Sequence, residues 1–183
     1  IYITASPHDL LKRALIAKGV QPEVRLCPWN DLIPKSKCIY TDDPTPEKPL
    51  IYHLFGHIKD PFSLVITEDE FFDYLIGITI NKELIPEAVR AALTSTALLF
   101  LGFRMDDWNF RVLFRMIMAQ GGRELLKLFS HAAAQIEPEE GRIIDAQRAR
   151  RYLEKYFISE NISMFWGSSE DFLDALRQNL GAG

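Results

Sequence analysis

An uninterrupted apolar run over residues 97–101, ending at Gly102, constrains the fold of this chain more than any other stretch of its sequence. Side chains of a strand point alternately to opposite faces, so a strand without polar alternation is covered on both faces, as central strands are. Short β-branched or aromatic runs alternate with helical patterns along the chain, which is typical of parallel strands joined by crossover helices. The sequence therefore predicts a three-layer α/β fold with a mostly parallel sheet and helices on both faces. The predicted strands cover residues 1–4, 49–55, 97–103, 131–136 and 162–166.

Helices are predicted between these strands from apolar residues at helical spacing. Thr67 and Glu70 form a capping box at the start of one helix, and Ser168 or Ser169 caps the last one. A further helix over residues 109–118 is apolar on nearly every side, so we expect it to pack between layers and to end at Gly121-Gly122. Residues 41–49, which include three prolines, and residues 137–141 are predicted loops. The apolar stripes consist of Leu10, Leu11, Ala14 and Leu15; of Phe71, Phe72, Leu75 and Ile76; and of Phe172, Leu173, Leu176 and Leu180.

Composition excludes several classes of protein. The formal net charge is −4 with acids and bases interspersed, so we expect no direct contact with nucleic acid. The two cysteines, Cys27 and Cys38, have no partners at zinc-ligand spacing, and we interpret them as free thiols of a cytoplasmic protein without a metal site. Neither a run long enough to cross a bilayer nor a signal peptide is present, so no membrane partner is expected.

Residues that directly follow the predicted strands are the candidates for ligand binding, because ligands of open parallel sheets bind outside the carboxyl ends of the strands. Gly102 would let a ligand approach the backbone, and the carboxylates of Asp106 and Asp107 could accept hydrogen bonds from ribose hydroxyls. The same aspartates could instead cap the following helix. Gly167 and the two serines after it could cradle part of a nucleotide, or the serines could act only as a helix cap.

Four histidines, His8, His53, His57 and His131, are the only imidazoles available for acid–base chemistry. His53 stands two residues before Phe55, so the two side chains would point to the same face of a strand. A single histidine is more often structural than catalytic. The chain has no nucleophile elbow, P-loop, HExxH or Gly-x-Gly-x-x-Gly motif, and the residues alone indicate an α/β domain with a nucleotide site.

Four segments, taken in order, carry a resemblance to a known family. The more specific motifs are Thr-Glu-Asp at residues 67–69 and Leu-Gly-Phe-x-x-x-Asp-Trp-Asn at residues 101–109. With these motifs the chain resembles the SIR2-like, sirtuin-related domain of prokaryotic NAD-consuming immune effectors. The segments are residues 2–11, residues 52–56 together with 64–72, residues 98–114 and residues 166–172.

This resemblance implies a Rossmann-like domain that binds NAD, in which an asparagine and a histidine promote cleavage of the nicotinamide–ribose bond. Ser6 stands where the family's Thr-Thr-Asn-x-Asp motif has asparagine, His8 where it has aspartate, and Phe55 where the Leu-His-Gly motif has histidine. A phenyl ring has no proton to exchange and a serine hydroxyl is shorter than a carboxamide, so neither residue does the same work. His53 or His57 is left as a substitute base. The implied cofactor-binding residues are Thr4, Ser6, Gly56, Gly102, Phe103, Asp106, Gly167 and Ser168.

Two features of the family have no counterpart in residues 1–183. One is its Gly-Ala-Gly phosphate-binding turn, and the chain begins at Ile1 within a strand-like stretch. We therefore expect a single SIR2-like domain, its carboxyl-terminal part, without the amino-terminal Gly-rich strand–helix unit, and weak or no NAD binding by this chain alone. The other is the zinc-binding module of deacetylating sirtuins, whose absence argues against protein deacetylation.

Three functions remain open. The chain could be a catalytically degenerate module for sensing or protein interaction, joined to other domains or protein partners of a larger, anti-phage assembly. It could be an active NAD+ glycohydrolase of a prokaryotic defence system, or an unrelated protein that shares the fold. Since family members commonly assemble, a homo-oligomer is expected. The resemblance and the residue roles drawn from it depend on Ser6, Phe55, Gly102 and Gly167 lying along one rim of a single parallel sheet.

Overall fold

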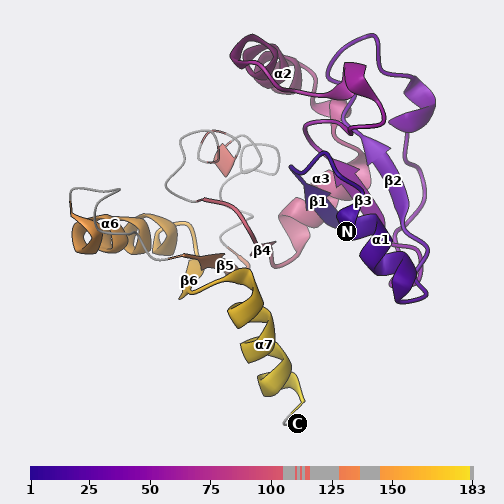
Figure 1. The fold of residues 1–183 in the computed structure, drawn as a ribbon. Coiled ribbons are helices and arrows are strands. Elements are labelled where there is room, and N and C mark those ends of the chain that lie inside the picture. Colours follow the sequence, from indigo (N-terminus) through magenta and orange to yellow (C-terminus); the bar gives the residue numbers. More distant parts are fainter. Residues whose placement is uncertain (105–109, 111, 113, 116–127, 137–144, 182–183) are drawn as a thin grey trace. The chain divides into compact units, whose positions relative to one another are not determined.

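The computed structural model describes residues 1–104, 110, 112, 114–115, 128–136 and 145–181 (Figure 1). The chain divides into two compact units, Ile1–Ala92 and Leu93–Gly183, and each is described by itself. Each unit holds a three-stranded sheet whose neighbouring strands are parallel. The predicted α/β class with parallel strands is confirmed, and its strands form two sheets of three.

In the first unit, β3 (Leu50–His53) lies between β1 (Tyr2–Thr4) and β2 (Glu23–Leu26). Every residue of β3 is buried, whereas the two edge strands are partly exposed. The sequence analysis missed β2, because its four residues alternate charged and apolar side chains over too short a span to stand out. The three strands end in register, since Thr4 and Leu26 both pair with His53. The loops that follow them therefore leave the sheet along one rim.

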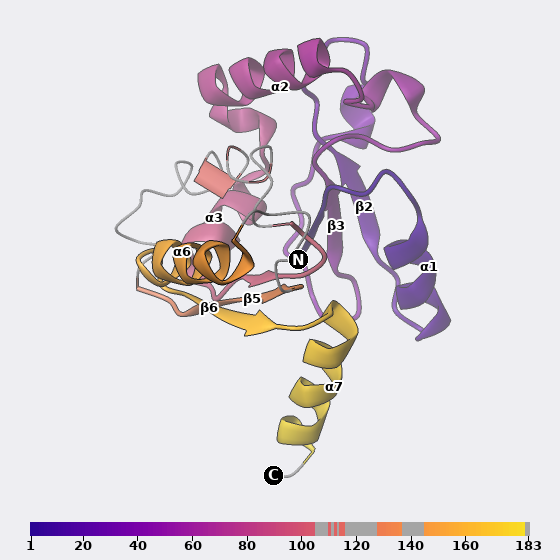
Figure 2. The same cartoon turned by 60° about the vertical axis from the view of Figure 1, so that its left-hand side comes forward.

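Two helices of the first unit lie where the sequence predicts them, and a third was not predicted. They are α1 (Leu10–Ala17) and α2 (Glu68–Ile80), with α3 (Glu87–Ser95) spanning the boundary between the units. The capping box of α2 is confirmed, because Thr67 Oγ1 accepts from Glu70 N at 3.2 Å and Glu70 Oε2 accepts from Thr67 N at 2.9 Å. Both views place α1 alongside the sheet next to β2 (Figures 1 and 2). Three 3₁₀ turns, Lys35–Lys37, Pro61–Ser63 and Lys82–Leu84, complete this unit as described.

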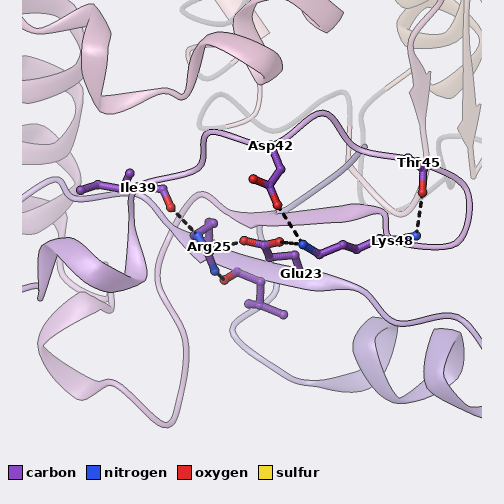
Figure 3. A network of polar contacts seen from close by, with 7 residues as sticks. Glu23, Arg25, Ile39, Asp42, Thr45 and Lys48 are labelled. Carbon is purple, nitrogen blue, oxygen red and sulfur yellow. Dashed lines mark hydrogen bonds and ion pairs between the residues drawn. The ribbon is translucent and has the colours of Figure 1, made fainter.

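The predicted loop over residues 41–49 has no regular element, and a polar network fastens it to β2 (Figure 3). The ammonium of Lys48 bonds Glu23 at 2.9 Å and Asp42 at 2.8 Å. Arg25 also pairs with Glu23 and donates to the carbonyl of Ile39. This segment therefore covers the outer edge of β2, which would otherwise present unpaired backbone groups.

In the second unit, β5 (His131–Gln135) lies between β4 (Leu99–Phe100) and β6 (Ile162–Trp166). The prediction of a central strand over residues 97–103 is wrong for this sheet, in which β4 is a two-residue edge strand. The central position belongs to β5, whose small alanine side chains allow close packing on both faces. The bounds of β6 are those predicted.

Aromatic rings dominate the core of this unit as described. Phe100 contacts Phe110 and Phe114 at centroid distances of 6.1 and 5.6 Å, and Phe114 contacts Phe157 at 5.8 Å. Phe157 belongs to α6 (Ala146–Ile158), a helix that the sequence analysis did not predict. The predicted last helix is α7 (Ser169–Leu180), and its cap is Ser168. The helix over residues 109–118 lies largely outside the described residues, and Gly121-Gly122 and the loop at 137–141 lie outside them entirely.

Candidate functional site

The rim formed by the strand ends of the first sheet brings together several of the predicted site residues. The hydrogen-bond ladder continues one step beyond the strands, since Leu54 N donates to Thr4 O at 2.9 Å and Cys27 N to His53 O at 3.0 Å. Ser6 and the segment from Phe55 to His57 follow immediately. The structure therefore groups Ser6, His53, Phe55 and His57 at one rim. Gly102 and Gly167 follow strands of the second sheet, so the expectation that all four strand ends lie along one rim of a single sheet is wrong.

The turn after β1 is held by its own hydroxyls. Ser6 N donates to Thr4 Oγ1 at 3.0 Å, and His8 N donates to Ser6 Oγ at 3.4 Å. Such short side-chain acceptors stabilise turns by satisfying nearby backbone donors. Thr4 and Ser6, both predicted to bind cofactor, thus shape the backbone of the rim. Ser6 is exposed there.

His53 is 2% exposed and holds the turn after β1 to β3. Its Nδ1 lies 3.0 Å from the carbonyl oxygen of Ser6, so Nδ1 carries the proton and donates. The lone pair therefore resides on Nε2, which has no hydrogen bond within the described part of the chain. Burial lowers the pKa of His53, and the nearby His57 lowers it further. The ring is a neutral imidazole at neutral pH, the form that a general base requires.

His57 has both ring nitrogens engaged. Its Nδ1 accepts from Lys59 N at 3.2 Å, so Nε2 carries the proton and donates to Asp9 Oδ1 at 2.8 Å. The hydrogen bond from Lys59 to the other carboxylate oxygen is the main reason that the pKa of Asp9 falls to about 2, and His57 lowers it further. The His57 ring also meets His53 edge to face at 4.9 Å. This clamp joins two loops separated by 48 residues in the sequence.

Phe55 packs against α2 instead of continuing the strand. Because β3 ends at His53, the expectation that His53 and Phe55 share a strand face is wrong. The Phe55 ring meets Tyr74 at 5.1 Å and Phe71 at 5.9 Å, edge to face in both cases. Gly56 follows with φ +79°, and a Cβ there would lie 2.0 Å from the carbonyl oxygen of Ser63. The glycine is thus required by the packing of the chain on itself, whether or not a ligand is bound.

The predicted site residues of the second unit have mainly structural partners. Gly102 has φ +73°, and a Cβ added there would meet no described atom within 4 Å, whereas Phe103 packs on Phe110 at 4.9 Å. Gly167 N donates to Gln135 O at 2.9 Å. Asp106 lies outside the described residues.

Ser168 forms a complete capping box with the first turn of α7. Its Oγ accepts from Asp171 N at 3.1 Å, and Ser168 N donates to Asp171 Oδ2 at 2.9 Å. Of the two interpretations of these serines, the helix cap is the one that the structure describes. The backbone N–H of Ser168 is already satisfied by a carboxylate.

Asp9 and Lys59 are the residues of this region whose roles sequence reasoning missed. Asp9 lies in the predicted strand-end segment, but nothing in the sequence indicates that it meets His57. Lys59 carries no motif. The one available signal is that Lys59 stands two residues after His57, a separation typical of a tight turn that brings the two residues together.

Both cysteines are free, as predicted, and the structure shows that both are buried. Burial raises the pKa of Cys27 to about 12 and also raises that of Cys38. Neither is therefore a thiolate nucleophile at neutral pH. Among the described residues there is no group of three or more histidine, cysteine, aspartate or glutamate side chains that could hold a metal ion, and no helix is long and apolar enough to cross a membrane.

The fold and the rim define an α/β protein with parallel strands whose polar loops gather at the carboxyl ends of β1 and β3. The family is shown by comparison of sequences, in which the model of the SIR2-like domain family matches residues 1–160. The chain therefore belongs to the SIR2-like domain family, whose domains are generally NAD-related. A search of curated proteins found no match.

Proposed function

We propose that this chain is a catalytically degenerate SIR2-like module that does not hydrolyse NAD and serves sensing or protein interaction within a larger, anti-phage protein. The supporting observation is the set of contacts made by residues 53–57. Phe55, at the position of the family's histidine, packs against Phe71 and Tyr74. His57 has both ring nitrogens engaged, and His53 is 2% exposed.

Catalytic cleavage of the nicotinamide–ribose bond by this family's chemistry needs a proton acceptor within hydrogen-bond reach of the substrate. A phenyl ring offers none. The imidazole of His57 would have to release the Lys59 backbone N–H before its Nδ1 could accept a proton. Ser6, at the position of the family's asparagine, has only a short hydroxyl to orient a ribose.

A second candidate, an active NAD+ glycohydrolase, is favoured by one observation. His53 keeps an Nε2 lone pair, and its lowered pKa keeps the ring neutral at neutral pH. In this alternative His53 is the base. The two functions therefore differ in whether His53 contacts a substrate.

Incubation of the purified chain with NAD, followed by chromatographic measurement of nicotinamide, separates the two. We expect wild type, His53→Ala and the control His8→Ala to release no more nicotinamide than a protein-free blank. His8 is the matched control because it is an exposed histidine on the same rim. Calorimetric titration should show no saturable NAD binding below millimolar concentration.

Nicotinamide release by wild type and His8→Ala that disappears in His53→Ala would establish the hydrolase instead. Release that persists in His53→Ala would also contradict the degenerate module and would remove His53 from the mechanism. A micromolar NAD isotherm would show that the chain retains a cofactor site.

A further inference from the structure

A cavity of about 260 Å³, with charged side chains around partly apolar walls, lies beside the rim of the first sheet, at the carboxyl end of β2. Its walls come from α1, β2, the 3₁₀ turn after β2 and the loop after β3. Ser6, His53 and Phe55 do not line it. Its charged and titratable lining includes Asp9, Lys12, Lys37, His57, Lys59 and Asp60.

Positive charge exceeds negative charge around this cavity. Four of the lining side chains are cationic, counting Arg25 with the three lysines, and two are carboxylates. Because Glu23, outside the lining, pairs with Arg25, one positive charge is left over. Lys59 pairs with Asp9, and Lys37 pairs with Asp60. These pairs hold two lysines in place at the cavity while leaving them exposed, with 71% of the Lys59 and 46% of the Lys37 side chain accessible.

Lys12 supplies the charge that is not neutralised by the protein. It projects from α1 and has no hydrogen bond or ion pair within the described part of the chain. Arg25 differs, because its guanidinium is already used by Glu23, the Ile39 carbonyl and the Val24 carbonyl at the edge of β2 (Figure 3). An incoming anion would therefore gain most from Lys12, with Lys37 and Lys59 as shared donors.

We propose that this cavity binds a small phosphate monoester, of the size of a phosphorylated sugar. A phosphate monoester carries a charge of about −1.5 to −2 at neutral pH and three strong acceptor oxygens, which suit the ammonium of Lys12, unpaired among the described residues, and the exposed ammonium groups of Lys37 and Lys59. Pockets for drug-sized ligands measure roughly 300 to 1,000 Å³. The cavity is smaller than that, so it suits a compact phosphate ester and not a dinucleotide.

His57 connects this cavity to the rim. It lines the cavity, and its ring meets His53 at 4.9 Å and donates to Asp9. A phosphate that recruits Lys59 competes with Asp9 for that lysine and so changes the charge on the carboxylate that accepts from His57. Binding in the cavity therefore alters the surroundings of His57 at the rim. A sensing module needs such a link between ligand binding and a second region.

Titration of the full 183-residue chain with ribose 5-phosphate, followed by calorimetry and by the His57 ring signals in NMR, tests the site. We expect saturable binding with a shift of the His57 signals, no binding of unphosphorylated ribose, and weaker binding at high salt because salt screens exposed charges. Lys12→Met should weaken binding about tenfold, the loss expected for one charge-assisted hydrogen bond. Lys18→Met is the matched control, because Lys18 follows α1 but does not line the cavity.

The site would be overturned by the absence of saturable ribose 5-phosphate binding up to tens of millimolar, by equal losses in Lys12→Met and Lys18→Met, or by equal binding of ribose. Circular dichroism melting of both variants checks that they fold. The proposal does not depend on NAD chemistry. Nicotinamide release by the chain would refute the degenerate module. The ribose 5-phosphate titration alone decides whether the phosphate site exists.

Discussion

Gly56 offers the sharpest test of how the rim is built. Its φ of +79° lies in the left-handed region, where a residue with a side chain loses about 1–2 kcal/mol. In addition, the Cβ of an alanine would lie 2.0 Å from Ser63 O and 2.7 Å from Leu64 N. Both atoms belong to backbone, so two chain segments must separate, and overpacking of this kind costs about 1–3 kcal/mol. We expect Gly56→Ala to lower the free energy of unfolding by about 2–5 kcal/mol.

Gly19 provides a control for the conformational part of this effect. Its φ is +80°, but nothing in the described part of the chain lies within 4 Å of an added Cβ. Gly19→Ala should therefore cost only about 1 kcal/mol, because the lower entropy of the unfolded alanine chain offsets part of the backbone strain. The difference between the two variants measures the close approach of the loop to Ser63. Urea denaturation of both variants supplies the two free energies, provided that the slopes agree.

Trp29 gives a local readout of the same movement. Its indole Nε1 donates to the Ser63 carbonyl at 2.8 Å, the same oxygen that the Gly56→Ala side chain would displace. We expect the indole N–H signal of Trp29 to shift in Gly56→Ala and to remain unchanged in Gly19→Ala. Equal destabilisation of the two variants, with an unmoved Trp29 signal, would refute the argument that Gly56 is fixed by protein packing.

Two further predictions concern charge and capping. Asp9→Asn should lower stability by about 1–2 kcal/mol at pH 6, a value reduced for partial solvent exposure of the carboxylate. The folded-state pKa of Asp9 is about 2, below its ordinary value of 3.8. The stabilisation is therefore present above pH 4 and is lost as the pH falls toward 2. In urea denaturation, the stabilities of wild type and variant should converge as the pH is lowered from 5 toward 2. Thr67→Ala should cost about 1 kcal/mol through loss of the cap of α2, whereas Thr67→Ser, which keeps the hydroxyl, should cost little. A Thr67→Ser variant as unstable as Thr67→Ala in thermal melting would contradict the capping argument.

Local patterns were enough to predict the elements whose signals lie within a few residues. The bounds of β6 and the caps at Thr67 and Ser168 follow from neighbouring side chains alone. The strand β2 was missed because its Glu-Val-Arg-Leu sequence is stabilised by distant residues, with Lys48 and Ile39 holding its charged side chains. The position of a strand within its sheet could not be predicted from local patterns either. The apolar run at 97–101 reads as a central strand, yet β4 lies at an edge of its sheet as described.

The sequence predicted where in the fold the candidate site lies, but not which side chains contact one another there. The rule that strand ends gather at one rim located Ser6, Phe55 and His57 in the same region. It could not indicate that His57 bonds Asp9 across 48 residues, because that contact depends on the path of two loops. Nor could alternation along a strand place Phe55, since β3 ends two residues earlier.

The contacts of Phe55 also bear on the proposal that it stands at the family's histidine position. A general base must be neutral, within reach of the substrate and free to change its hydrogen-bond partner. The ring of Phe55 meets the rings of Phe71 and Tyr74, so a phenyl ring gains apolar contact with two side chains of α2. A base at this position would have to exchange its proton from among those rings. If the proposal is right, Phe55→His alone should therefore create no NAD hydrolysis, and nicotinamide release by that variant would contradict it.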